Sequence, residues 1–117
     1  MQVDSTRLLD APLIEVAGEI DHGNASLLTA AFESTIDEGA DIVLLDLSDV
    51  TYLDSGGISA ILAAVRHLRD RGWLGAINPN ANVRRLLEIV GLSVDNGFRV
   101  FADRTEAEKA LGESSES

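Results

Sequence analysis

The sequence contains no cysteine, a single lysine and no long apolar run. Without cysteine, disulfides, thiolate zinc sites, iron–sulfur clusters and cysteine nucleophiles are excluded, which suits a reducing compartment, and we expect a cytoplasmic protein. No apolar run approaches the ~20 residues that span a bilayer, and the first residues do not resemble a signal peptide, so we expect neither membrane insertion nor export. The lysine, Lys109, does not follow a glycine-rich loop, which disfavours nucleotide hydrolysis.

Basic side chains are also scarce. Nine lysine and arginine residues stand against 20 aspartate and glutamate residues, for a net charge of −11. This charge repels nucleic-acid phosphates and anionic lipid headgroups, so we expect no direct nucleic-acid binding. Two interpretations of the charge stay open: a partner with a basic patch, or solubility alone.

The length and apolar content predict one domain. A chain of 117 residues fits the usual range of about 50–250 residues for a single domain. Its 45% hydrophobic residues supply a core without cross-links. The C-terminal end is polar, so we expect a domain over residues 1–112 and a polar C-terminal tail over residues 113–117.

The order of strand and helix patterns predicts an α/β fold. Apolar alternation and helical periodicity follow one another in the order ββαβαβαβα, which implies a mostly parallel mixed sheet flanked by helices. The strands are expected at residues 2–9, 13–20, 41–47, 73–77 and 98–101, with the first turn at residues 10–12 and the aliphatic third strand in the centre of the sheet. The helices are expected to contain residues 28–36, 57–71, 83–90 and 105–111.

Three details of these helices can be tested. Gly39 and Gly91 follow the first and third helices, where a helix C-cap belongs. The third helix is expected to direct Val83, Leu86, Leu87 and Val90 inward. The last helix is expected to begin with a capping box formed by Thr105 and Glu108.

The segment that follows the central strand is the candidate site. In open α/β sheets, functional groups gather just beyond the carboxyl ends of central strands. Here that position holds Asp54, Ser55, Gly56 and Gly57. Either Asp54 or Ser55 suits the N-cap of the next helix, and the glycines allow a tight turn. From residue type alone, Ser55 is most simply a cap.

Catalytic and metal-binding interpretations fit this segment poorly. A hydrolase elbow needs Gly-x-Ser-x-Gly, which is absent, and only His22 and His67 could serve as an imidazole base. His67 lies three helical turns from Ser55 and cannot reach it. Asp46, Asp49 and Asp54 are near one another in sequence, but no histidine joins them, and we expect no metal or cofactor.

The helix after Ser55 has a face with few charges. Opposite its aliphatic stripe lie small or weakly polar residues, namely Gly56, Ser59, Ala60, Ala63, Ala64 and His67. Such a face suits docking of a partner. Alternatively, the alanines are there because alanine favours helices, or because the fold itself covers this helix on both sides. Docking and this structural explanation both stay open.

Two strings resemble a known family. Residues 42–58, which run from the aliphatic strand through Leu53-Asp54-Ser55-Gly56-Gly57, look like the signature of bacterial anti-sigma factor antagonists, the STAS domain family. Residues 16–21, with Gly18-Glu19-Ile20-Asp21, resemble the end of that family's second strand. The similar features cover most of the chain in the expected order.

This resemblance implies a phosphorylation switch. Ser55 would receive phosphate from an anti-sigma factor that is also an ATP-dependent serine kinase, so the protein would be a substrate and ligand and not an enzyme. The unphosphorylated form would bind the anti-sigma factor and free a sigma factor, and a serine phosphatase would restore it. Asp21 would lie near the kinase contact. We expect partner binding by the residues around Ser55, namely Asp21, Asp54, Ser55, Gly56, Gly57, Ser59, Ala60 and Ala63.

The chain departs from the family pattern at two places. Gly56 stands where the family often has a second serine or threonine, and Gly57-Ile58-Ser59 replaces Gly-Leu-Gly. Ser59 and Thr51 are secondary acceptor candidates. A second class of function is a STAS scaffold or an accessory subunit of a stress-signalling or transport complex. An enzyme is the third and least favoured class, because a base, a lysine and metal ligands are missing.

Overall fold

A five-stranded sheet and four α-helices form in the predicted order. The computed structural model describes residues 1–115. The elements are β1 (Gln2–Leu8), β2 (Ala11–Ile20), α1 (Ala25–Asp37), β3 (Ile42–Leu53), α2 (Ser55–Leu68), β4 (Trp73–Ile77), α3 (Ala81–Ile89), the short 3-10 helix η1 (Leu92–Val94), β5 (Phe98–Phe101) and α4 (Arg104–Ser115). Among these described residues, no helix is long and apolar enough to cross a bilayer.

The sheet is mixed and mostly parallel, as predicted. Its strand order is β1-β2-β3-β4-β5, which places β3 in the centre. β1 pairs with β2 in antiparallel fashion, whereas the other three pairings are parallel. Parallel pairing needs crossover helices, and these cover the sheet and exclude water from its central strands. The predicted α/β class is therefore confirmed.

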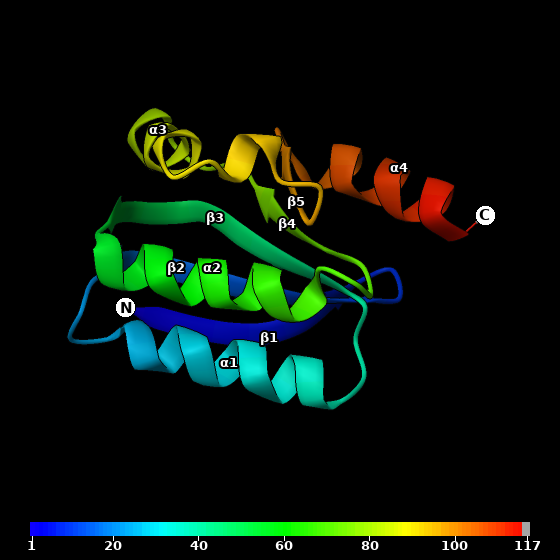
Figure 1. Ribbon diagram of the computed structural model, residues 1–117, viewed down its shortest axis with the longest axis horizontal. Helices are drawn as coiled ribbons and strands as arrows, with labels where there is room; N and C mark the ends of the chain where they lie inside the picture. The colour runs from blue at the N-terminus through cyan, green and yellow to red at the C-terminus, as the bar shows by residue number, and fades with distance from the viewer. Residues whose placement is uncertain (116–117) are drawn as a thin grey trace.

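The two faces of the sheet bury different side chains. Neighbouring residues of a strand point to opposite faces, so Leu45 packs in the core beneath α1 and α2 while Leu44 packs with Leu111 of α4. Figure 1 shows α1 and α2 lying side by side along one face, with α4 on another side of the molecule. Both faces of β3 are thus covered over its first half, which explains its aliphatic run.

The third strand is longer than its apolar pattern predicts. It continues from residue 47 to Leu53, because the parallel pairing with β2 continues to the Ile20–Leu53 pair. Ser48 and Asp49 are exposed and polar in this extension, so the hydrophobic pattern does not predict a strand there. The first turn also differs from the predicted residues 10–12. β1 ends at Leu8 and β2 already begins at Ala11, and Leu9 in the turn has a φ of 54°.

The third helix buries fewer residues than predicted. Val83 and Leu87 are buried, but Leu86 is 36% exposed and Val90 is 41% exposed. The helix has only nine residues and contacts the core along one narrow stripe, so the two outer positions of the predicted face remain in solvent. Gly91 behind it adopts φ +86° and Gly39 behind α1 adopts φ +95°, as expected for C-terminal glycines.

The predicted capping box of the last helix is wrong by two residues. Asp103 Oδ1 accepts from Glu106 N at 2.9 Å, and Glu106 Oε2 accepts from Ala102 N at 3.3 Å. Aspartate caps as well as threonine does, so the helix begins at Arg104 and not after Thr105. The helix also passes Leu111 and ends at Ser115, so residues 113–115 of the expected tail are helical, and residues 116–117 lie outside the described residues.

An ionic cluster joins the first residue of α4 to β2 and β3. Arg104 donates to Asp46 Oδ2 on β3 at 2.8 Å and to Glu15 Oε2 on β2 at 2.8 Å. Burial raises the pKa of Asp46, but hydrogen bonds from Ser48 and the pairing with Arg104 outweigh it and hold that pKa below its ordinary 3.8. The cluster therefore stabilises the fold only while Asp46 is ionised.

Asp46→Asn should lower the free energy of unfolding by about 1–2 kcal/mol at about pH 7, because the buried charge that pairs with Arg104 is lost. A depressed pKa contributes stability that is present above the unfolded value and is lost as pH falls through the folded value. The difference between wild type and variant should therefore shrink as the pH falls below 3.8, as measured by urea-induced unfolding at several pH values. Glu15→Gln is the control and should change little, since this pair is exposed. A difference that persists undiminished in acid would refute this account of the cluster.

Candidate phosphorylation and partner-binding site

The site forms where the carboxyl ends of β2 and β3 meet. Ile20 and Leu53 are register partners at the ends of these two parallel strands. Ser55 is the first residue of α2, directly after β3, and its side chain is exposed. The loop that leads from β2 into α1 therefore lies beside the N-terminus of α2.

Asp54 is the N-cap of α2. Its Oδ1 accepts from Gly56 N at 2.8 Å and from Gly57 N at 3.3 Å, which satisfies two amides that otherwise lack a helical partner. Its Oδ2 accepts from His22 N at 3.1 Å, and its own N–H donates to Ile20 O. Of the two predicted caps, Asp54 is therefore the N-cap, and the Ser55 hydroxyl has no capping role.

The charge of Asp54 suits this position. Burial raises its pKa, but the three backbone N–H donors and the nearby His22 outweigh that effect, so the pKa lies below the ordinary 3.8. The positive end of the α2 dipole favours the same ionised form. The site therefore carries a fixed negative charge next to the Ser55 hydroxyl at neutral pH.

Sequence reasoning named His22 as one of two possible imidazole bases but did not place it beside Ser55. Its Nε2 lies 3.0 Å from Ser55 Oγ, within hydrogen-bond distance. Ile20 and Leu53 are register partners, and His22 and Ser55 each lie two residues after one of them. Extending the third strand to Leu53 would have revealed this proximity. His67 lies in the last turn of α2, away from Ser55 as predicted.

The two glycines after Ser55 have different reasons to be glycine. A Cβ at Gly57 would lie 2.2 Å from Leu53 Cδ1 and 2.7 Å from Ile20 Cγ2. A Cβ at Gly56 would lie 2.9 Å from His22 Nδ1 and 3.0 Å from His22 Cα. Gly57 thus lets α2 pack tightly on the core, and Gly56 makes room for the histidine.

Asp21 is close to the site, but its side chain accepts hydrogen bonds from its own turn. Its Oδ1 accepts from Gly23 N at 2.9 Å and from Asn24 N at 3.1 Å. Asn24 Oδ1 in return accepts from Asp21 N at 2.9 Å. These bonds hold the loop between β2 and α1 in one shape and so present His22 to Ser55.

The alanine face of α2 is covered by α1, which corrects part of the predicted docking surface. Ala60 is 6% exposed and Ala64 is 2% exposed. With the half-buried Ala63, they line a narrow crevice against Phe32 and Ile36 of α1. Small residues allow the two helices to approach closely, so Ala60 is not available to a partner.

Two further predicted positions remain accessible. Ser59 is exposed one turn after Ser55, and Thr51 is exposed on β3. Ser55 and Ser59 thus lie on the outer side of α2, whereas the alanines point toward α1.

Two of the three aspartates considered as metal ligands have other roles, and the third is exposed. Asp46 pairs with Arg104, Asp54 caps α2, and Asp49 is exposed on β3. Within residues 1–115, no group of three or more histidine, aspartate or glutamate side chains could hold a metal ion.

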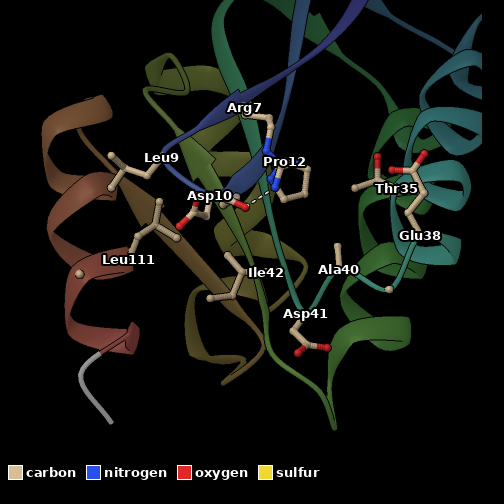
Figure 2. Close-up of a pocket in the computed structure, with 13 residues that line it drawn as sticks. Arg7, Leu9, Asp10, Pro12, Thr35, Glu38, Ala40, Asp41, Ile42 and Leu111 are labelled. Atoms are coloured by element: carbon tan, nitrogen blue, oxygen red, sulfur yellow. Dashed lines mark hydrogen bonds between the residues drawn. The ribbon is translucent and has the colours of Figure 1, made fainter.

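A hollow of about 620 Å³ lies at the opposite end of the sheet (Figure 2). The turn between β1 and β2, the segment before β3 and the end of α4 surround it, and Arg7 donates to the Asp10 carbonyl at its edge. Ser55 lines neither this hollow nor the crevice between α1 and α2. Ser55 and His22 are both exposed, so the candidate site lies at the protein surface.

The fold and this site define a STAS domain. The chain matches the model of the STAS domain family over residues 2–107 and belongs to that family. The "Anti-sigma-B factor antagonist" of Listeria monocytogenes is 38% identical to it over 82 residues, which are 68% of this chain and 71% of that protein.

Solved structures show the same fold. A crystal structure of an anti-sigma factor antagonist from Mycobacterium paratuberculosis has a TM-score of 0.82 at 23% identity and covers 93% of this chain and 92% of that chain. The Bacillus cell fate determinant SpoIIAA in its phosphorylated form has a TM-score of 0.74 at 21% identity and covers 94% of this chain and 99% of that chain. The match to the STAS family model confirms the family resemblance seen in the sequence, and these structures confirm the fold.

Gly57→Ala should lower the free energy of unfolding by about 1–3 kcal/mol, because the new methyl group overlaps the side chains of Leu53 and Ile20. Urea-induced unfolding measures this loss. Gly112→Ala on α4 is the matched control: its Cβ would meet no heavy atom within 4 Å, so it should be neutral or stabilising. Equal stability of the two variants would show that the close packing of α2 is not as described.

Proposed function

We propose that this protein is an anti-sigma factor antagonist controlled by phosphorylation of Ser55. In its unphosphorylated form it binds an anti-sigma factor that is also a serine kinase, and a sigma factor is released. Phosphate on Ser55 ends that binding, and a serine phosphatase restores it. The observation that carries the proposal is the exposed Ser55 hydroxyl at the start of α2, which Asp54 relieves of any capping role. The names of the relatives support the proposed partner.

The surface offered to the partner surrounds Ser55. It comprises Ser55, Ser59 and the loop with Asp21 and His22, and the Asp54 carboxylate joins that loop to the start of α2. Its acidic character and the net charge of −11 favour a partner surface with basic residues. The exposure of Ser55 supports a role as substrate and ligand for another protein's active site.

Phosphorylation can switch binding without changing the fold. A phosphate adds about −1.5 to −2 charges, and the amides and dipole at a helix N-terminus tolerate negative charge. In a complex, however, the same dianion would have to lose its water next to the Asp54 carboxylate. Removing water from such a charge in an interface costs several kcal/mol, roughly a hundredfold or more in affinity.

Affinity capture from native-host lysate tests the proposal, with wild type, Ser55→Ala and Ser55→Glu as baits and mass spectrometry as the readout. We expect an ATP-binding anti-sigma factor to be held by the alanine variant and released by the glutamate variant. Ser34→Glu is the control, because it adds the same charge at an exposed serine on α1 outside the proposed surface, and it should hold the partner as wild type does. Capture of one non-kinase assembly by all baits would reject the switch and favour the alternative, a STAS scaffold or accessory subunit of a stress-signalling or transport complex.

A further inference from the structure

His22 and Ser55 form a pair that the fold holds in place from both sides. Ser55 Oγ and His22 Nε2 are 3.0 Å apart although the residues are 33 positions apart in sequence. The Asp54 carboxylate accepts the His22 backbone N–H, and the turn built by Asp21 and Asn24 fixes the loop around it. The imidazole is therefore presented to the serine by the backbone and not by a flexible side chain alone.

Gly56 is part of the same arrangement. A Cβ there would lie 2.9 Å from His22 Nδ1, closer than real Cβ atoms approach their neighbours. The residue next to the proposed acceptor thus lacks a side chain at the position that the imidazole occupies. The family often has a second serine or threonine at this position. In this chain, the space that His22 occupies is a physical reason for the glycine.

We propose that His22 takes the Ser55 hydroxyl proton during phosphoryl transfer and then pairs, as an imidazolium, with the phosphate on Ser55. This rests on the proposed function, with ATP held by the kinase as the phosphoryl donor. The Ser55 O–H bond breaks and its proton passes to His22 Nε2. The oxygen forms a bond to the γ-phosphorus, the bond to the β,γ-bridging oxygen breaks, and ADP leaves. His22 thus becomes a catalytic residue supplied by the substrate protein.

The charges around the pair favour this role. Asp54 is the charged group in contact with the His22 loop from α2, and Asp21 is the charged group next to it in the loop itself. A phosphate dianion next to the Asp54 carboxylate is disfavoured unless a cation pairs with it. The proton received by His22 supplies that cation at the moment when the phosphate forms, so the product is stabilised without a lysine or arginine.

The test uses the full chain with phosphoserine incorporated at position 55 through an expanded genetic code. Phosphorus NMR follows the second ionisation of the phosphate in wild type, His22→Gln, Gly56→Ala and the control His67→Gln. Loss of the imidazolium in His22→Gln should raise the phosphate pKa by about one unit, a tenfold change in proton affinity. Gly56→Ala retains the imidazole but displaces it, and should raise the pKa in the same direction, whereas His67→Gln should match wild type.

Nitrogen NMR of the unmodified protein tests the proton acceptor. We expect the neutral His22 ring to carry its hydrogen on Nδ1, which leaves Nε2 free to accept from Ser55. A hydrogen on Nε2 would overturn the proposal, as would one phosphate pKa shared by wild type, His22→Gln and Gly56→Ala. Because the phosphoserine is encoded and not transferred by a kinase, these outcomes are independent of the lysate capture, and each proposal can fail without the other.

Discussion

The Asp54 carboxylate is the contact on which this end of the molecule depends. One oxygen accepts from the first amides of α2, and the other accepts from the His22 amide in a loop that follows a different strand. A single side chain thereby begins a helix and joins it to the neighbouring β–α connection. Three backbone donors on one carboxylate also keep that group ionised, so the site combines a fixed backbone with a fixed charge.

The parallel register below this contact explains why the two segments meet. β2 and β3 end together at the Ile20–Leu53 pair, and both residues are fully or almost fully buried. Gly57 lies over them without a side chain, which brings α2 close to the sheet. Core packing and the candidate site are therefore continuous: tight burial at Gly57 positions Ser55 at the surface two residues earlier.

Much of the fold could be predicted from the sequence, because parallel strands and amphipathic helices carry strong hydrophobic patterns. The 73–77 strand is predicted with its observed bounds. The second half of β3 was missed, since its stability comes from backbone pairing with β2 and its exposed side chains are polar. Because the end of β3 was not predicted, the proximity of His22 to Ser55 was not predicted either. The burial of Ala60 was also undecided, because small residues suit both a helix contact within one fold and a partner surface.

Rigid local bonding determines what kind of signal the site can transmit. The helix start, the loop and the core beneath them are each satisfied by contacts that do not involve the Ser55 hydroxyl, apart from its bond to His22. Adding a phosphate therefore leaves those contacts in place and changes the charge of one exposed spot. A partner would detect the change through electrostatics and desolvation at its own interface, and not through a rearranged antagonist. Such a switch needs a stable platform, and the bonds of Asp54 provide it.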